Sequence, residues 1–209
     1  MTTTTSKEFI KAVLDLINVE FQAAGWVKRK PGMFSVNLSA DNYGWVGLNM
    51  AIGRGNGILE INPMICVGNL KIEKFVAELM GLKFKPYTTA AIGTNVGYLM
   101  LERKYRPWLF QKGNDWKPQI VEMVAVVEEF GRQFLEQNLT LEALYETLLK
   151  SKRGVPPDPL DYRIAVASVL LGKRVEAVAF VNARLREIGA RNDEAAEWFR
   201  KFATKLREL

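Results

Sequence analysis

The sequence predicts an α+β protein, with an antiparallel sheet of four or five strands packed by helices and then an all-helical C-terminal portion. Two observations predict this class. After an opening helical stretch, apolar and polar residues alternate over residues 33–67 in runs separated by turn-forming residues, which is typical of an antiparallel meander. After Trp116, apolar residues instead recur at intervals of three and four, as they do in helices.

The first predicted element is a helix over residues 7–24. Thr5 and Glu8 have the spacing of a capping box at its start, and Gly25 is a typical helix terminator. One face of this helix is apolar and carries Ile10, Val13, Leu14, Ile17, Phe21 and Ala24. We expect this face to pack against the sheet.

Three strands are predicted next, over residues 33–40, 45–52 and 58–67, because apolar side chains alternate in each of them. The segments between them are rich in Gly, Asn and Asp and predict turns: Asp41-Asn42-Tyr43-Gly44 and Gly53-Arg54-Gly55-Asn56-Gly57. Since Pro63 has no backbone N–H, we expect the third strand to lie at a sheet edge or to carry a bulge there.

A second helix is predicted over residues 70–80, with Asn69 as its N-cap and Gly81 as its terminator. Two further short strands are predicted at residues 87–92 and 96–101, on either side of a loop at Gly93-Thr94-Asn95. These elements complete the predicted sheet and its helical cover.

The remainder of the chain is predicted to be helical. Pro118 suits a first helical turn, and Thr140 is placed to cap a short helix. The three prolines in residues 155–159 exclude a continuous helix there and mark the clearest break in the sequence. We therefore predict an α+β domain over residues 1–153 and a helical extension over residues 160–209, either separate or docked. Its predicted helices are 160–171, 174–188 and 193–209.

Composition excludes several classes of chemistry. The 209 residues include no histidine and one cysteine, Cys66. Ser-His and Cys-His nucleophile pairs, and zinc sites built from histidine or several thiolates, are therefore excluded. We expect no cofactor and no metal. With no apolar leader or membrane-length apolar stretch, and no pair of cysteines for a disulfide, we expect a cytoplasmic protein that does not associate with membranes.

Three features that resemble catalytic motifs have simpler structural interpretations. Gly53, Gly55 and Gly57 are followed by a predicted strand, whereas a phosphate-binding loop leads into a helix N-terminus. Cys66 lies in an apolar strand, where a thiol behaves as a small buried hydrophobe. Glu60 alternates with apolar residues and is expected on the solvated face of its strand.

Aromatic and basic residues are interleaved in the sheet half and its junction with the helices. Cations attract phosphate and aromatic rings stack on bases, so the mixture could bind single-stranded nucleic acid. Trp, Tyr and Arg are equally typical of protein interfaces, and the rings could also belong to the core beneath a basic surface. The candidate binding residues are Tyr43, Trp45, Arg54, Arg103, Lys104, Arg106 and Trp108. The net charge of +6 favours acidic partners in either case.

Residues 1–150 carry a further pattern: a helix ending in Ala24-Gly25-Trp26-Val27-Lys28-Arg29, alternating strands, Ala91-Ile92-Gly93, Trp108-Leu109-Phe110, and a helical stretch from Pro118 to Lys150. This order resembles small bacterial families of unknown function, some of which accompany polymorphic toxins as immunity proteins. The resemblance implies a binding role without catalysis, and it supplies no catalytic residues.

These observations predict a cytoplasmic, non-enzymatic binding protein, with an immunity-like or inhibitory protein as one version. The alternative is a nucleic-acid-binding accessory protein that uses the basic, aromatic-rich surface. A third class, a histidine-free hydrolase or transferase, lacks a readable site in the sequence.

Overall fold

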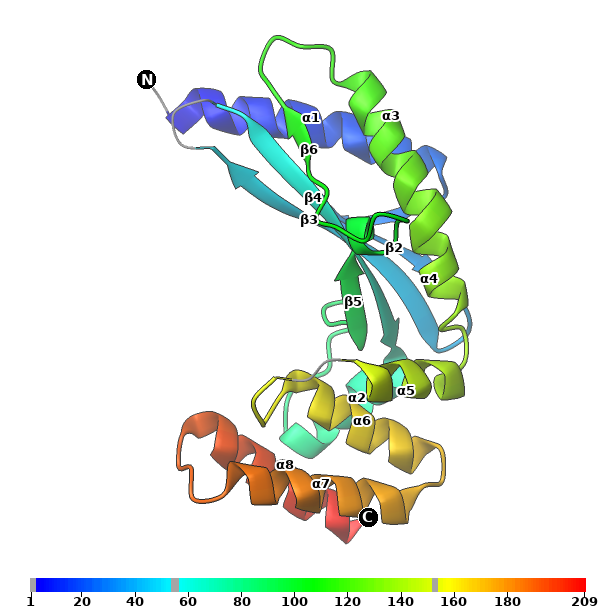
Figure 1. The fold of residues 1–209 in the computed structure, drawn as a ribbon, viewed down its shortest axis with the longest axis vertical. Helices are drawn as coiled ribbons and strands as arrows, with labels where there is room; N and C mark the ends of the chain where they lie inside the picture. Colours follow the sequence, from blue (N-terminus) through cyan, green and yellow to red (C-terminus); the bar gives the residue numbers. More distant parts are fainter. Residues whose placement is uncertain (1–2, 54–56, 152–153) are drawn as a thin grey trace. The chain divides into compact units, whose positions relative to one another are not determined.

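The structure, a computed structural model, describes residues 3–53, 57–151 and 154–209, and it confirms the α+β class (Figure 1). Within these residues the strands form one sheet in the order β1-β2-β3-β4-β5, and β6 also pairs with β4. The strands are β1 (Val27–Lys30), β2 (Met33–Asn37), β3 (Asn42–Ile52), β4 (Leu59–Asn69), β5 (Ile92–Asn95) and β6 (Trp108–Phe110).

Residue contacts divide the chain into two compact units. Unit 1 draws on residues 1–38, 43–67 and 93–136 and holds most of the sheet. Unit 2 draws on residues 39–42, 68–92 and 137–209 and is mainly helical. Each unit therefore combines segments that are distant in sequence. The sequence predicts two domains, residues 1–153 and 160–209, the first of which folds as one cooperative unit. This cooperativity stays a prediction, and Lys152 and Arg153 lie outside the described residues.

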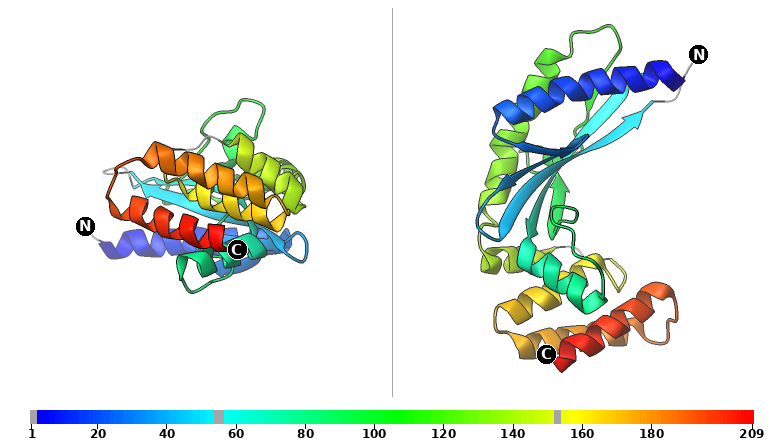
Figure 2. Two further views of the ribbon diagram at one scale, coloured as in Figure 1. Left: turned by 90° about the horizontal axis from the view of Figure 1, so that it is seen from below. Right: turned by 180° about the vertical axis from the view of Figure 1, so that it is seen from behind.

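In unit 1, helix α1 (Thr3–Ala23) crosses one face of the sheet (Figure 2). The helix begins at Thr3, before the capping box that was predicted to start it, whereas Gly25 follows its end with a φ of 85° as expected of a terminator. Phe21 stacks on Phe34 of β2 with ring centroids 4.4 Å apart. This apolar contact fixes the helix on the sheet.

A second helical segment covers the same sheet face. It consists of α3 (Lys117–Val126), one π-helical turn η2 (Val127–Gly131) and α4 (Arg132–Glu136). Val36 pairs with Gly44 across β2 and β3, and a Cβ at Gly44 would lie 2.6 Å from a methyl carbon of Leu135 in α4. Only glycine leaves room for this packing, so the residue predicted to form a turn is a contact point in the core.

β4 is an interior strand, so of the two alternatives predicted for Pro63 the edge position is wrong, and the bulge stays a prediction. The strand is flanked by β3 and β5 and also pairs with β6. Its ladder with β6 joins Leu59 to Phe110 and Ile61 to Trp108, and it ends before Pro63. The missing N–H of Pro63 thus falls beyond the paired residues of that ladder.

Several strand boundaries differ from the prediction. Residues 42–44 belong to β3 rather than to a turn, and Asn42 is buried. The predicted loop at residues 93–95 lies in β5, and the residues after it form a short 3₁₀ turn, η1 (Val96–Tyr98). Gly93 marks a close approach rather than a turn, because a Cβ there would lie 2.4 Å from Sγ of Cys66. The prediction missed β1, whose residues are all exposed, and the short β6.

Unit 2 is built from helices whose predicted caps are confirmed. Asn69 Oδ1 accepts a hydrogen bond from Ile72 N (2.9 Å) at α2, and Thr140 Oγ1 accepts one from Ala143 N (3.1 Å) at α5. The helices are α2 (Leu70–Met80), α5 (Leu141–Lys150), α6 (Pro159–Leu170), α7 (Arg174–Ile188) and α8 (Glu194–Glu208). Figure 2 shows α7 and α8 side by side.

The core of unit 2 includes a fully buried carboxylate. Asp161 of α6 is 0% exposed and lies 2.9 Å from Nε of Arg184 in α7. It also accepts a hydrogen bond from the backbone N–H of Asp158 (2.8 Å), which forms a capping box. Burial raises the pKa of Asp161 above its ordinary value, against the opposing effects of the Asp158 amide and Arg184. Helices α6 and α7 are therefore joined by a buried ion pair.

Candidate binding sites

The structure distributes the candidate binding residues over core and surface. Tyr43 and Trp108 are buried, and Trp45 is half-buried on the sheet. Arg103 and Lys104 are exposed. Arg54 lies outside the described residues. The described members of this set therefore do not lie together on a single surface.

Trp108 and Arg106 both contact Glu122 in unit 1. The Trp108 indole donates a hydrogen bond from Nε1 to Oε2 of Glu122 (3.1 Å), and the guanidinium carbon of Arg106 lies 5.2 Å from the centre of the indole ring. Arg106 also forms an ion pair with Glu122. Both side chains thus have intramolecular partners, which leaves Arg103 and Lys104 as the cations of this region available to a ligand.

Trp45 lies flat on its own strand. A Cβ at Gly47 would lie 2.5 Å from Cζ3 of the Trp45 ring, so glycine is needed for this arrangement. The buried Nε1 of Trp45 has no hydrogen-bond partner in the described parts of the chain. An unpaired buried donor costs about 1–3 kcal/mol. Trp45 therefore contributes to unit 1 chiefly by apolar packing.

Residues 98–109 of unit 1 are held by contacts at Gly97 and Arg106. A Cβ at Gly97 would lie 2.4 Å from the carbonyl oxygen of Lys104, so only glycine allows the chain to fold back here. Asn62 of β4 donates a hydrogen bond from Nδ2 to the carbonyl of Arg106 (2.9 Å). Arg103 adopts a φ of 46°, a conformation that is uncommon for residues other than glycine. The loop is thus fixed against the sheet.

The outer side of residues 98–109 exposes apolar and aromatic side chains. Leu101 is 92% exposed, and Tyr98, Tyr105 and Leu109 are each about half exposed. The hydroxyl of Tyr105 donates a hydrogen bond to Glu60, and this bond raises the pKa of Tyr105 above its ordinary value. We call this feature, residues 98–109, the loop surface.

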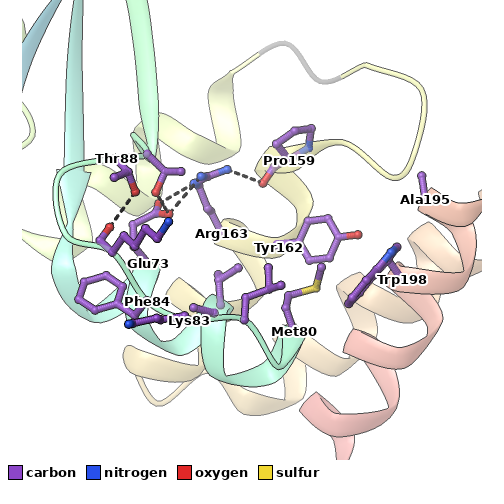
Figure 3. A pocket seen from close by; sticks show the side chains of 15 residues that line it. Glu73, Met80, Lys83, Phe84, Thr88, Pro159, Tyr162, Arg163, Ala195 and Trp198 are labelled. Atoms are coloured by element: carbon purple, nitrogen blue, oxygen red, sulfur yellow. Dashed lines mark hydrogen bonds and ion pairs between the residues drawn. The ribbon is translucent and has the colours of Figure 1, made fainter. Parts of the chain in front are cut away.

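A second candidate site is a pocket of about 460 Å³ within unit 2 (Figure 3). Its walls come from α2, the loop after α2, the start of α6 and the start of α8. Most of the lining is apolar and includes Val76, Met80, Phe84, Tyr162 and Trp198. The size and apolar character are those of pockets that bind small molecules.

One side of the pocket is a buried ion pair. Glu73 of α2 is 6% exposed, and its two carboxylate oxygens lie 2.7 Å from Nε and 3.1 Å from Nη2 of Arg163 in α6. The hydroxyl of Thr89 donates to the same carboxylate at 2.6 Å. Arg163 also donates from Nη1 to the carbonyl of Pro159 (3.0 Å). The carboxylate and the guanidinium therefore neutralise each other within the wall.

The opposite side of the pocket carries the aromatic rings of Tyr162 and Trp198 and the thioether of Met80 (Figure 3). Tyr162 packs edge-on against Phe202 and Phe199, with ring centroids 4.8 Å and 5.1 Å apart. Burial raises the pKa of Tyr162 to about 12, so its hydroxyl is neutral at physiological pH. This side offers a rigid apolar surface.

Sequence reasoning missed this pocket. Glu73 and Arg163 are 90 residues apart in the chain, and each fits the polar side of an ordinary amphipathic helix. The nearest signal was the loop after α2, where Lys83 and Lys85 alternate with Leu82 and Phe84. That pattern alone does not indicate which residues elsewhere in the chain lie next to this loop.

Among the residues that the structure describes, no group of three or more Cys, Asp or Glu side chains is placed to hold a metal ion. No helix in the same ranges is long and apolar enough to cross a membrane. Comparisons of the chain with protein-family models, with curated proteins and with solved structures found no match.

Proposed function

We propose that this chain is a binding protein that docks an acidic protein partner on the loop surface of unit 1. The observation that carries the proposal is Leu101, which is 92% exposed on a loop that contacts at Gly97 and Asn62 hold in place. A large apolar side chain displayed in this way loses little conformational freedom when a partner covers it.

The chemistry of the loop surface supports a protein partner. Tyr98 and Tyr105 are residues of the type that dominates protein interfaces, and they flank Leu101 in the sequence. Arg103 and Lys104 have no ion-pair partner among the described residues, so their charges are available to a partner. Opposite charge on the partner would speed association and select against basic proteins. An acidic surface complements this one best.

The same residues favour protein over nucleic acid. Bases stack on exposed aromatic faces, but the candidate rings Tyr43 and Trp108 are buried and the Trp45 ring lies against its strand, so stacking would depend on the half-exposed Tyr98 and Tyr105. Tyr105 is bound to the carboxylate of Glu60, which would repel a phosphate. Nucleic acid remains the second candidate, because Arg103 and Lys104 would attract it equally well.

The resemblance of residues 1–150 to immunity-like families supports a narrower hypothesis. In that version the acidic partner is an enzyme or toxin that the chain inhibits by covering it. The proposal of a docking surface does not depend on this version.

Capture from the host lysate by the tagged full-length chain, read by mass spectrometry, tests the proposal. We expect an acidic protein to be retained by the wild type and lost with Leu101→Ser and with Arg103→Glu combined with Lys104→Glu. The matched control is Lys28→Glu combined with Lys30→Glu on β1, which reverses two exposed charges elsewhere in unit 1. The control should retain the partner.

Two outcomes would contradict the proposal. The first is that every captured protein is retained equally by the loop variants. The second is that the wild type retains nucleic acid, in a salt-dependent manner, and the loop variants release it; this would establish the second candidate.

A further inference from the structure

The pocket of unit 2 combines an apolar interior with an excess of positive charge at one side. Lys83 and Lys85 line it from the loop after α2, and the paired Glu73 and Arg163 form part of the same lining. Because Arg163 already neutralises Glu73, the two lysine charges are left without a counter-charge among the described lining residues. An anion at this side would meet two cations and no unpaired carboxylate.

The pocket also has directly opposed chemistry on its two sides. Figure 3 places the Glu73–Arg163 pair and Thr88 on one side, and Tyr162, Met80 and Trp198 on the other. Thr88 donates its hydroxyl to the carbonyl of Lys85 (2.7 Å), which holds the lysine-bearing loop in shape. A ligand with a negative head near the two lysines and an apolar body would match both features of the pocket.

We propose that this pocket is a binding site for a small amphipathic carboxylate, such as a medium-chain fatty acid. The carboxylate lies near Lys83 and Lys85, and the hydrocarbon chain extends over Met80 and Tyr162 towards Trp198. The volume of about 460 Å³ lies within the range of about 300–1,000 Å³ that is typical of small-molecule sites. The site is independent of the loop surface, so either proposal can fail alone.

The interior and the rim contribute differently to the expected binding. Burial of each methylene stabilises a complex by about 0.8 kcal/mol, so each methylene removed from the chain weakens binding by about fourfold. The lysines supply the preference for a negative head, and this preference falls with added salt because exposed charges are screened. Varying the chain length of the ligand therefore tests the apolar interior of the pocket, and varying the charge of its head tests the two lysines.

Isothermal titration of the full-length chain with decanoate, octanoate and decyltrimethylammonium tests the proposal. We expect decanoate to bind at least about tenfold more tightly than octanoate, by the methylene increment above, and to bind more tightly than the cation, although the alkyl chain of the cation is one carbon longer. Lys83→Gln combined with Lys85→Gln should remove the preference for the anion. Lys74→Gln is the matched control, since Lys74 is an exposed lysine of α2 that pairs with Glu78 outside the pocket.

A pocket-filling variant locates the site. Ala195→Trp places a large ring in the pocket from the exposed start of α8, and it should abolish decanoate binding. An unchanged thermal midpoint for this variant would show that it is folded. The proposal is overturned if decanoate does not bind, if Ala195→Trp leaves its binding unchanged, or if decyltrimethylammonium binds as tightly as decanoate.

Discussion

The two units place their charged groups in contrasting ways. In unit 1, Glu128 of η2 accepts hydrogen bonds from Nε1 of Trp26 (2.5 Å) and Nε of Arg132 (2.8 Å), and both members of the ion pair keep about a third of their side-chain surface exposed. In unit 2, the Glu73–Arg163 and Asp161–Arg184 pairs are almost entirely buried. Unit 1 surrounds an aromatic core with hydrated pairs, whereas unit 2 has pairs inside its core.

This difference predicts which substitutions destabilise each unit most. A half-exposed ion pair contributes little, because water solvates either charge when the other is removed. A buried pair leaves an uncompensated charge in the core when one partner is lost, which costs several kcal/mol. Unit 1 should therefore be sensitive to changes in its rings, and unit 2 to changes in single charges.

The largest expected effect is the protection of Cys66, which reports on unit 1 alone. Burial raises the pKa of this thiol from 9.0 to about 12, so at pH 8 the native thiolate population is about a thousandfold below that of the unfolded chain. Thiol titration should show labelling only after denaturant is added. Rapid labelling of the native protein would mean that the sheet of unit 1 opens readily.

The next largest effect is expected at the fully buried carboxylate of unit 2. Asp161→Ala should lower the free energy of unfolding by about 3 kcal/mol, because Arg184 loses its buried partner and keeps as counter-charge the half-exposed carboxylate of Glu187. Denaturant titration measures this. Replacing both residues by apolar ones, Asp161→Leu with Arg184→Met, should restore much of the loss. A double variant as unstable as the single one would show that packing, not charge, decides this site.

A smaller effect is expected from the loss of one carboxylate in an ion pair, and it allows the two units to be compared directly. Glu73→Gln should lower the free energy of unfolding by about 1.5–3 kcal/mol, since it weakens charged hydrogen bonds to a buried guanidinium. Glu128→Gln, at the half-exposed pair of unit 1, should cost about 1 kcal/mol or less. Glu78→Gln on the outer face of α2 is the control. Equal losses for Glu73→Gln and Glu128→Gln would remove the contrast between the units.

The smallest effect concerns pH. Because the pKa of Asp161 is raised on folding, the folded chain binds more protons at this residue than the unfolded chain between pH 3.8 and the raised value. The contribution of Asp161 to the free energy of unfolding therefore falls as the pH rises through this window and is constant above it. The wild-type curve minus that of Asp161→Asn should show this decline. A difference that increases with pH would mean that Arg184 dominates over burial.

The sequence predicts the elements whose signals are local. Asn69 and Thr140 cap their helices because a side-chain oxygen three residues from a free amide is sufficient, and alternation located β2, β3 and β4 to within a few residues. Gly44 and Gly93 misled the prediction because glycine serves both turns and close packing. Leu135 and Cys66, which require those glycines, are distant in the sequence.

The candidate sites were less accessible to prediction. Arg103 and Lys104, predicted as binding residues, are exposed, and their binding role stays a prediction. The burial of Trp108 depends on Glu122 and β4, which periodicity does not reveal. The pocket depends on Glu73 meeting Arg163 across two helices. Such a pair becomes visible only when the packing of α2 on α6 is known.

The π-helical turn at residues 127–131 has a consequence for the length of the chain. A π turn holds about one residue more than an α-helical turn, so deleting one residue there would produce a continuous α-helix. Every later residue of that helix would then rotate by about 100° around its axis. Leu135 would leave Gly44, and Arg132 would leave the carbonyl of Ala24. A change of one residue in the length of this turn would therefore break the contacts that the later part of the helix makes with the sheet.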